Sequence, residues 1–219
     1  MSKTLAIYGA GGTGRGILDQ IRRAESIKST CDELIYIDDI LQTDTVYGIK
    51  RINWESMTQL YAKDEIGIVI SFGDPAIREQ IWGKVVRAGF HVVSYILPEA
   101  FVSSSVKIGE GCLIAKCYID NNVTIGDNVF VFPEAIIGHD VLIGDNSIVS
   151  ARSFIGGHSI LGKNVYYGPC AACRDRISIG EGAIVGLNAA VYKDVPSGFT
   201  AVGNPAHNLP RAEKRIFAK

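Results

Sequence analysis

The sequence predicts an α/β unit that is half of a dinucleotide-binding fold, followed by a parallel β-helix of about five coils. Two observations lead to this prediction. The first is a glycine-rich turn, Gly9–Gly14, between a short apolar run and an amphipathic stretch. The second is an apolar or near-apolar residue at every sixth position over residues 125–191. We expect the α/β unit to cover residues 1–97, and the β-helix with a C-terminal tail to cover residues 98–219.

The first hundred residues alternate between strand and helix patterns. Short apolar runs over residues 4–8, 33–37 and 66–71 predict buried strands, and residues 76–88 and 90–96 predict a helix and a fourth strand. A strand, a glycine-rich turn, a helix and a second strand that ends at Asp38 follow the order of a dinucleotide-binding motif. Because only half of a doubly wound domain precedes the repeats, we expect one mononucleotide site. A tight turn without a ligand is the alternative.

The six-residue period fits neither a helix, with a period of about 3.6, nor a single strand, with a period of about 2. It fits short strands wound around a triangular prism, in which a glycine often follows the inward residue where the chain enters a corner. Eighteen residues then complete one coil, so that residues i and i+18 stack at the usual distance between strands, about 4.8 Å. The inward series is Ile125, Val131, Ile137, Ile143, Val149, Ile155, Leu161, Tyr167, Cys173, Ile179, Val185 and Val191.

Composition excludes several classes of protein. Lys and Arg number 22 and Asp and Glu number 23, so the formal net charge of −1 gives no field that would attract nucleic acid or an anionic membrane. No apolar stretch approaches the roughly 20 residues of a membrane-spanning helix, and the first residues make a poor signal peptide. Five scattered cysteines fit a reducing compartment. We therefore expect a cytoplasmic protein and a structural role for Cys170 and Cys173. For the basic C-terminal tail we expect exposure to solvent, and phosphate binding is the alternative.

His139 is the candidate catalytic residue. It lies two residues past the inward Ile137, at a corner where side chains point out of the prism, and Asp140 follows it. A carboxylate beside an exposed imidazole holds one tautomer and raises its basicity, which a general base requires. Gly157 occupies the same corner one coil later, where its backbone N–H can meet a developing oxyanion. A surface histidine without a function is the alternative.

Taken together, these motifs resemble the hexapeptide-repeat acetyltransferases of nucleotide-linked amino sugars, a group that includes bacillosamine and perosamine N-acetyltransferases and sialic acid O-acetyltransferases. The resemblance covers nearly the whole chain. It implies a left-handed β-helix, a homotrimer, and acetyl-CoA bound in the groove between adjacent helices, with no metal. The motifs are IYGAGGTG (7–14), YIDD (36–39), ISFGDPAIR (70–78), GHDVLIGD (138–145), Gly156-Gly157 and AVGNPA (201–206).

The same resemblance assigns roles to individual residues. It implies that His139 is the general base, that Asp140 raises its basicity, and that Gly157 donates to the thioester carbonyl. Thr13 and Ile148 replace histidines that relatives often carry, and His158 is a candidate to supply the hydrogen bond lost at Ile148. The nucleotide-sugar contacts are expected at Gly11, Gly12, Thr13, Asp38, Asp39 and Gly73, and the acetyl-CoA contacts at Ile148, Gly157, Pro169 and Leu187.

The predicted reaction is direct acetyl transfer from acetyl-CoA to the amino group of a UDP-, dTDP- or GDP-linked 4-amino-dideoxy sugar. Acetylation of a hydroxyl, as on sialic acid, is the nearest alternative, because the sequence hardly separates the two acceptors. A zinc enzyme of the β-helix carbonic anhydrase kind needs three histidines, whereas only His139 and His158 lie in the repeats. A non-catalytic or NAD-dependent binding module is the third alternative, and it rests on the glycine-rich turn alone. The sequence leaves the sugar and its nucleotide open.

Overall fold

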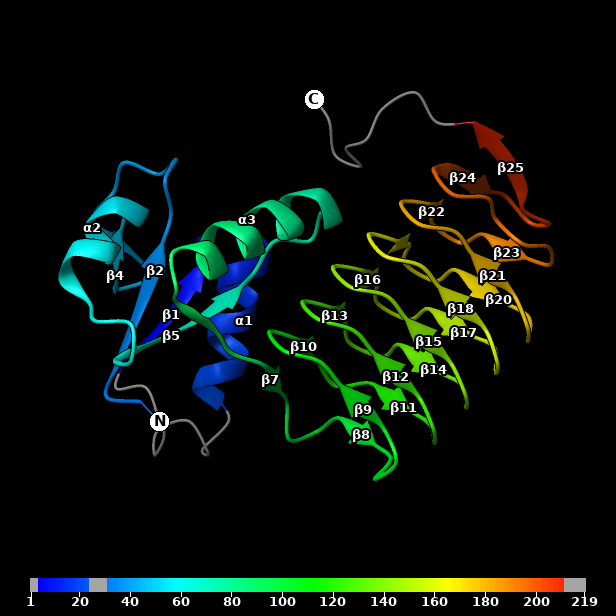
Figure 1. Ribbon diagram of the computed structural model, residues 1–219, viewed down its shortest axis with the longest axis horizontal. Helices are drawn as coiled ribbons and strands as arrows, with labels where there is room; N and C mark the ends of the chain where they lie inside the picture. Colours follow the sequence, from blue (N-terminus) through cyan, green and yellow to red (C-terminus); the bar gives the residue numbers. More distant parts are fainter. Residues whose placement is uncertain (1–3, 24–30, 211–219) are drawn as a thin grey trace. The chain divides into compact units, whose positions relative to one another are not determined.

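The computed structural model describes residues 4–23 and 31–210, and the chain forms two compact units (Figure 1). The first unit comprises Met1–Gly73 and Gln80–Val93, and the second comprises Asp74–Glu79 and Ser94–Lys219. The tail over residues 211–219, expected to be solvated, lies outside the described residues. Within the described ranges, no helix has both the length and the apolar character needed to cross a membrane.

The first unit is built on a sheet with the strand order β3-β4-β2-β1-β5-β6. The central strand β1 (Thr4–Tyr8) pairs in parallel with both β2 (Glu33–Ile37) and β5 (Ile66–Ile70). All five residues of β5 are buried, as expected for a central strand of a parallel sheet that is covered on both faces. The other strands are β3 (Thr45–Val46), β4 (Ile49–Ile52), which pairs antiparallel with β3, and β6 (His91–Val92).

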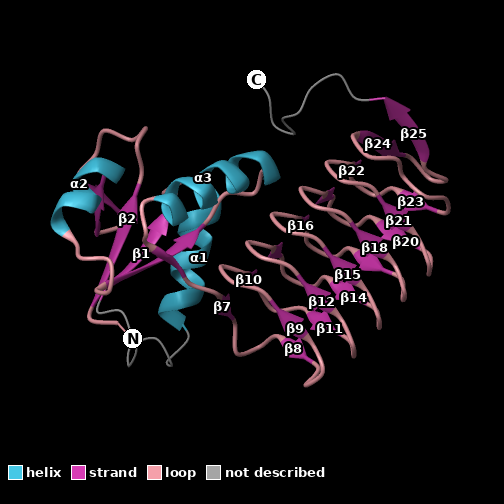
Figure 2. Ribbon diagram, in the orientation of Figure 1, coloured by secondary structure: helices cyan, strands magenta, loops and turns pink. Residues whose placement is uncertain are grey.

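Three helices accompany this sheet. Helix α1 (Gly12–Arg23) buries Gly14, Ile17, Leu18 and Ile21, the stripe that its sequence pattern predicts. Helix α2 (Trp54–Leu60) is capped by the Asn53 side chain, which accepts a hydrogen bond from the Ser56 N–H. Helix α3 (Pro75–Arg87) begins with a proline, which suits the first helical position because no intrahelical partner is lost there. Figure 2 shows strands and loops, without helices, in the coils that follow.

The strand predicted over residues 90–96 is wrong in one respect, because it is two strands. Val93 still donates its N–H to the Ile68 carbonyl of the first sheet, whereas Tyr95 donates to the Cys112 carbonyl of the coils. The chain therefore changes sheets at Ser94, which separates β6 from β7 (Tyr95–Ile96). The hydrophobic pattern continues through both strands, so it gave no sign of the break. It also gave no sign of the short elements β3, β4 and α2.

The second unit is a parallel β-helix with three sheets, and its first coil begins at β7 (Figure 1). The first sheet contains β7, β10 (Leu113–Ile114), β13 (Phe130–Val131), β16 (Ile148–Val149), β19 (Tyr166–Tyr167), β22 (Ile184–Val185), β24 (Phe199–Val202) and β25 (His207–Pro210). The second contains β8 (Phe101–Val102), β11 (Tyr118–Ile119), β14 (Ile136–Ile137), β17 (Phe154–Ile155), β20 (Ala172–Cys173) and β23 (Ala190–Val191). The third contains β9 (Lys107–Ile108), β12 (Thr124–Ile125), β15 (Leu142–Ile143), β18 (Ile160–Leu161) and β21 (Ser178–Ile179).

The pairing register confirms the predicted coil of eighteen residues. Ile125 pairs with Ile143, Ile143 with Leu161, and Leu161 with Ile179. Their side chains are at most 3% exposed and belong to one continuous core. Since the 5-stranded third sheet supplies one strand to each complete coil, the predicted class, a half-Rossmann unit followed by a β-helix of about five coils, is confirmed.

The corners of the coils use two kinds of residue. A glycine follows many inward residues because the next coil stacks too closely for a side chain: a Cβ on Gly144 would lie 2.6 Å from the backbone carbon of Gly162. The left-handed backbone conformation falls elsewhere in the corner, at residues such as Asp140 (φ 60°) and His158 (φ 57°). Asn, Asp and His are the non-glycine residues that tolerate this conformation best. The corner geometry therefore fixes the backbone of Asp140 and His158 one coil apart.

Arg78, in the part of α3 that belongs to the second unit, explains why Asp74–Glu79 group with the β-helix. Its side chain is fully buried, and it donates from Nε to the Asn128 carbonyl (3.0 Å) and from Nη2 to Asn128 Oδ1 (2.7 Å). The guanidinium also lies over the Phe130 ring, 5.7 Å from its centroid. Burial lowers the pKa of Arg78 to about 9.

Candidate active site

His139 and Asp140 form a hydrogen-bonded pair at the corner between β14 and β15. His139 Nδ1 lies 2.7 Å from Asp140 Oδ2, and the two side chains are 47% and 32% exposed. An ionised carboxylate only accepts hydrogen bonds, so the Nδ1 of a neutral imidazole carries the proton and its Nε2 keeps a lone pair. This is the tautomer in which His139 can accept a proton from a substrate.

Asp140 is held in place by neighbours in its own column of the β-helix. Asn122, one coil earlier, donates from Nδ2 to Asp140 Oδ1, and His158, one coil later, places Nδ1 3.7 Å from Asp140 Oδ2. The His139 and His158 rings meet edge to face, with centroids 4.9 Å apart. Three coils therefore converge on one carboxylate, which restricts the orientation of the His139 ring.

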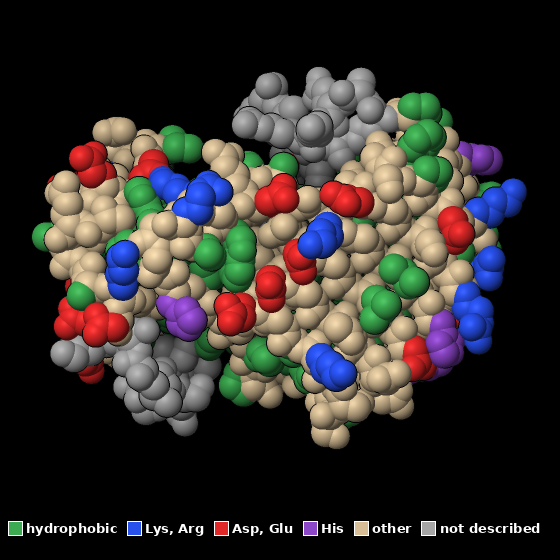
Figure 3. Space-filling view, in the orientation of Figure 1, with side chains coloured by type: hydrophobic (Ala, Val, Ile, Leu, Met, Phe, Trp, Pro, Cys, Tyr) green, Lys and Arg blue, Asp and Glu red, His purple; other side chains and the backbone are tan. Residues whose placement is uncertain are grey.

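The charges at this corner favour a basic imidazole. The pKa of His139 is raised, first by its hydrogen bond to Asp140 and then by the negative charges of Asp140, Asp120 and Asp175. The pKa of Asp140 is lowered, first by the hydrogen bond from Asn122 and then by the one from His139. Asp140 is therefore ionised at neutral pH, and His139 is a stronger base than a free histidine. Histidine and acidic side chains lie together at one edge of the coils in Figure 3.

Gly157 lies one coil beyond His139 in the same column, as the eighteen-residue period predicts. A Cβ on Gly157 would lie 2.9 Å from both Cε1 and Nε2 of His139, so the imidazole packs directly on the bare glycine. The expectation of an unoccupied N–H at this glycine needs correction, because Gly157 donates its N–H to Asp175 Oδ1 at 2.9 Å. Binding of a carbonyl at this amide therefore requires Asp175 to move.

The same corner contains the residues that could hold a metal ion. Ligand atoms of His139, Asp140 and His158 lie within 4.8 Å of one another. Two imidazoles and one carboxylate suit zinc or a related transition metal. The same atoms are equally explained by the hydrogen bonds and ring contact described above, so the geometry does not require a metal.

The structure separates the other residues expected to contact acetyl-CoA from His139. Pro169 and Leu187 stack at the corner between the first and second sheets, where the Asn188 N–H bonds to the Pro169 carbonyl at 2.9 Å. His139 lies at a different corner, between the second and third sheets. Leu187 is 71% exposed, whereas Ile148 has a completely buried side chain. The Ile148 side chain offers no exposed surface to the coenzyme, and the contact expected at this residue stays a prediction.

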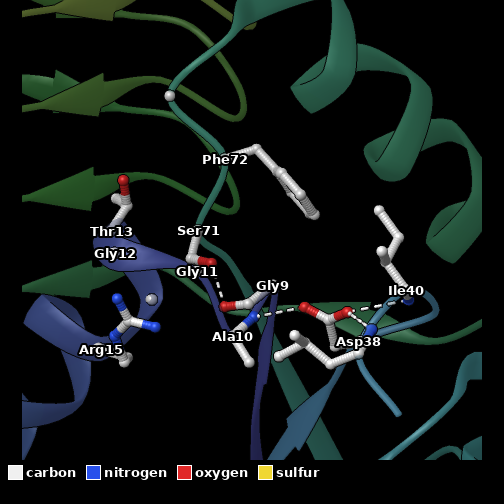
Figure 4. Close-up of a pocket in the computed structure, with 13 residues that line it drawn as sticks. Gly9, Ala10, Gly11, Gly12, Thr13, Arg15, Asp38, Ile40, Ser71 and Phe72 are labelled. Carbon is white, nitrogen blue, oxygen red and sulfur yellow. Dashed lines mark hydrogen bonds between the residues drawn. The ribbon is translucent and has the colours of Figure 1, made fainter.

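The first unit contains a cavity of about 330 Å³ at the end of β1 (Figure 4). The glycine-rich turn and the start of α1 form one wall, and Asp38 and the residues after it form another. Of the residues expected to bind the nucleotide sugar, all but Asp39 line this cavity. The lining residues are Gly9, Ala10, Gly11, Gly12, Thr13, Gly14, Arg15, Asp38, Ile40, Leu41, Ser71, Phe72 and Gly73.

The glycines of the turn differ in what they do for the fold. A Cβ on Gly14 would lie 1.9 Å from the Gly9 carbonyl oxygen, and Gly9 has a φ of +103°, so the turn itself requires both glycines. A Cβ on Gly11 or Gly12 would meet nothing within 4 Å. Because internal packing does not require these two glycines, close approach of a ligand explains them better. The same open space faces the cavity.

Asp38 and Asp39 have different surroundings. Asp38 Oδ2 accepts the Ala10 N–H at 2.9 Å, and its Oδ1 accepts the N–H groups of Ile40 and Leu41, also at 2.9 Å (Figure 4). Asp38 thereby fixes both walls of the cavity. Its other carboxylate lone pairs remain available to a ligand.

Asp39 instead belongs to a cluster next to the sheet. Its Oδ1 accepts the Trp54 N–H at 2.7 Å, and its Oδ2 lies 2.7 Å from the Tyr8 hydroxyl and 3.0 Å from Lys84 Nζ. Burial would raise the pKa of Asp39, but these hydrogen bonds outweigh it and lower the pKa. Both oxygens of Asp39 are engaged and Asp39 is not among the residues that line the cavity, so the nucleotide contact expected there stays a prediction without support from this cavity.

Sequence reasoning missed several cavity residues. Arg15 supplies a positive charge to the wall, and Ile40, which is 85% exposed, supplies an apolar surface at its edge. Phe72 and Ser71 come from the end of β5, and Ser71 Oγ donates to the Gly9 carbonyl at 2.8 Å. The position of Ser71 and Phe72 directly after a buried strand was the signal that could have identified them, because ligands bind at the carboxyl ends of parallel strands.

Two protein families match the chain in the regions that the fold separates. The PglD N-terminal domain matches residues 4–85, and the bacterial transferase hexapeptide (six repeats) matches residues 122–157. The second match includes His139, Asp140 and Gly157.

The chain is also similar to individual proteins over nearly its whole length. It is 27% identical to the GDP-perosamine N-acetyltransferase of Escherichia coli O157:H7, over 96% of this chain and 98% of the relative. The acetyltransferase domain of PglB from Neisseria gonorrhoeae, solved in complex with acetyl coenzyme A, is 29% identical, with a TM-score of 0.86 over 95% of this chain and 100% of that domain. PerB from Caulobacter crescentus, solved with CoA and GDP-perosamine, shares the fold, with a TM-score of 0.83 at 24% identity over 94% of this chain and 97% of PerB.

Proposed function

We propose that the chain transfers an acetyl group from acetyl-CoA to the amino group of a nucleotide-linked sugar, because the PglD N-terminal domain and the hexapeptide repeat both match it and it is similar to N-acetyltransferases over nearly its whole length. The acceptor is a 4-amino-dideoxy sugar carried by a nucleoside diphosphate. The relatives named above support the reaction class, and the cavity of the first unit supports the nucleotide.

The proposed mechanism uses His139 as the general base and forms no acetyl-enzyme. The substrate amine attacks the thioester carbonyl, His139 Nε2 takes the proton that the nitrogen loses, and the carbonyl oxygen becomes an oxyanion. Collapse of this intermediate restores the carbonyl and breaks the C–S bond, and the CoA thiolate leaves and takes up a proton. Asp140 stabilises the imidazolium that exists between these steps.

The single observation that carries the proposal is the pairing of His139 Nδ1 with Asp140 at 2.7 Å while Nε2 faces the bare backbone of Gly157. A base and a backbone amide thus lie at one corner, which suits an acyl transfer in which proton loss and oxyanion formation happen together once Asp175 has left the amide. No cysteine belongs to the cluster of Asn122, His139, Asp140 and His158, so a thiol nucleophile has no support there.

The nucleotide is proposed to bind in the cavity of the first unit. The α1 N-terminus at Gly12 presents backbone N–H groups that have no partner within the helix, which suits a diphosphate, and Arg15 adds a positive charge. Asp38 can accept hydrogen bonds from a ribose or a base. Nucleotide sugars and acetyl-CoA are cytoplasmic metabolites, so we place the reaction in the cytoplasm.

We further propose that the active enzyme is a homotrimer with a coenzyme groove between neighbouring chains. Outward apolar side chains form a ladder along the second sheet, and Phe101 stacks on Tyr118 with ring centroids 4.7 Å apart. Hydrophobic side chains also reach the surface over β15 and β18 (Figure 3). A second chain would cover such faces, and it would bring the Leu187 corner of one copy near the His139 corner of another. The ladder comprises Phe101, Tyr118, Ile136 and Phe154, each 43–54% exposed.

Light scattering tests the oligomer. A trimer is the expected mass, and Phe154→Asp should dissociate it and abolish activity. An active monomer would contradict the shared groove.

The reaction itself is tested by incubating the protein with acetyl-CoA and a panel of UDP-, dTDP- and GDP-linked 4-amino sugars, while free thiol release is followed. The matched control is the same nucleotide sugar with a hydroxyl in place of the amine. Thiol release with the amine alone supports N-acetylation. Release with the hydroxyl sugar instead would replace the proposal with O-acetylation, and absence of release with both acceptors would contradict an acetyltransferase for these substrates.

A further inference from the structure

We propose that the Asp175 carboxylate occupies the place of the thioester oxygen in the free enzyme, so that acetyl-CoA must displace it from the Gly157 amide. Asp175 would then set how strongly the enzyme prefers acetyl-CoA over free CoA. The inference rests on the proposed function, because it assumes that acetyl-CoA binds at the His139 corner.

The position of the Asp175 oxygen is the first support. Gly157 donates its N–H to Asp175 Oδ1 at 2.9 Å, which lies within the roughly 2.7–3.1 Å expected between an oxyanion and its donor. A Cβ on the same glycine would lie 2.9 Å from His139 Nε2. A carboxylate oxygen therefore lies on the amide of the glycine against which the proposed base packs.

The column that contains Gly157 explains how Asp175 reaches this position. His139, Gly157 and Asp175 follow one another at eighteen-residue intervals, so their backbones stack at one corner. Because Gly157 has no side chain, the imidazole of the coil before it packs against its backbone, and the carboxylate of the coil after it accepts its N–H. The negative charge of Asp175 is also one of the causes that raise the pKa of His139.

Similar hydrogen bonds occur at other corners and suggest a purely structural alternative. Asp127 Oδ1 accepts the Glu110 N–H at 2.8 Å, and Asp145 Oδ1 accepts the Asp127 N–H at 3.1 Å. Asp145, however, is also fixed by Lys163 at 2.7 Å, whereas no ion pair among the described residues fixes the exposed Asp175. The Asp175 side chain can therefore turn into solvent without breaking a second interaction.

Displacement of Asp175 has an energetic consequence. A hydrogen bond to a carboxylate is stronger than one to a neutral carbonyl, so exchanging Asp175 for a thioester weakens the ground-state complex. Free CoA lacks the thioester carbonyl and leaves the contact between Gly157 and Asp175 undisturbed. The Asp175 carboxylate therefore weakens the binding of acetyl-CoA but not the binding of CoA, its product.

The test compares the binding of two ligands to three forms of the full-length protein. Calorimetric titration of the wild type, Asp175→Asn and Asp175→Ala with acetyl-CoA and with CoA gives the ratio of the two dissociation constants. We expect Asp175→Ala to shift this ratio about five-fold in favour of acetyl-CoA, and Asp175→Asn, which keeps a neutral oxygen acceptor, to shift it less. The ratio matters because loss of a negative charge strengthens binding of both anionic ligands equally.

Asp127→Ala is the matched control, since it removes an equivalent side-chain bond to the backbone at another corner and should leave the ratio unchanged. Equal changes for both ligands in the Asp175 variants, or weaker acetyl-CoA binding with a lower Tm, would overturn the inference in favour of a structural role. A wild-type protein that binds neither ligand would overturn the proposed function itself, which is a separate and recognisable result.

Discussion

The two units prepare their sites in different ways. The first unit encloses a cavity of about 330 Å³ whose walls are backbone segments fixed by Asp38 and by the packing of Gly9 and Gly14. The β-helix instead presents His139 and Asp140, 47% and 32% exposed, on an open corner. The walls of the cavity come from one chain, whereas the proposed trimer would add a second wall beside the His139 corner. The difference suggests that binding specificity resides in the first unit and that reactivity in the second depends on assembly.

Replacement of His139 should give the largest effect, a loss of reactivity in the second unit. His139→Ala should lower kcat by about 10²-fold or more while leaving acetyl-CoA binding nearly unchanged, because a general base acts in the transition state. Steady-state kinetics and calorimetry on the same preparation check both parts. His91→Ala, which replaces an exposed histidine of β6 in the first unit, is the matched control and should retain the rate. A kcat near the wild-type value in His139→Ala would remove His139 from the mechanism.

Substitutions of glycine test whether the first unit acts on the nucleotide alone. Gly12→Leu should raise the dissociation constant for the nucleotide sugar about ten-fold, because its side chain enters the open space of the cavity, and it should leave Tm and acetyl-CoA binding intact. Gly157→Ala should instead raise the dissociation constant for acetyl-CoA and leave binding of the nucleotide sugar intact, because its Cβ would press on the His139 ring at 2.9 Å. Calorimetry of both variants with both ligands makes the crosswise comparison.

Gly14→Ala is the control for fold damage. Its Cβ would lie 1.9 Å from the Gly9 carbonyl oxygen, so the variant should have a lower Tm and a general loss of nucleotide binding. If Gly12→Leu behaved like Gly14→Ala, the open space beside Gly12 would serve folding and not a ligand.

The pH dependence of kcat/KM tests the basicity of His139, and here the expected effect is smaller. His139 must be neutral to act as a base, so kcat/KM should rise with pH through its pKa, which Asp140 and the nearby carboxylates hold above the ordinary value. Asp140→Asn removes the largest cause, so the rising limb should move to lower pH and the plateau should fall, because the imidazole becomes a weaker base. Profiles of kcat/KM at constant ionic strength measure both changes. A limb that stays in place would mean that another group titrates.

The regular part of the molecule could be predicted from the sequence because each coil repeats one steric rule. The period placed Gly157 above His139 correctly, since positions eighteen apart must stack. Asp175 follows in the same column by the same rule, but the sequence analysis did not single it out, and periodicity does not say which hydrogen bonds its side chain makes. Whether the Gly157 N–H is free or bonded depends on the side-chain rotamer of Asp175, and a repeating sequence pattern does not determine that rotamer.

The irregular part was harder to predict because its contacts join distant segments. Asp39 is engaged by Tyr8 and Lys84, and no local pattern connects residues 31 and 45 positions apart. Ile148 was assigned to the coenzyme by resemblance, whereas its burial depends on tertiary packing over the first sheet of the β-helix. The glycine-rich turn was recognised, but only the packing around each glycine separates Gly9 and Gly14, which the fold requires, from Gly11 and Gly12.

Removal of metal ions should have the smallest effect and distinguishes the open corner from a metal centre. His139, Asp140 and His158 provide three ligand atoms within 4.8 Å of one another, one imidazole short of the three-histidine set of a β-helix carbonic anhydrase. In direct transfer, His139 takes the proton at Nε2, and a metal bound there would block it. Dialysis against a chelator should therefore leave kcat unchanged, and metal analysis of the active protein should find less than one ion per chain. Loss of activity that added zinc restores would contradict the general-base role of His139.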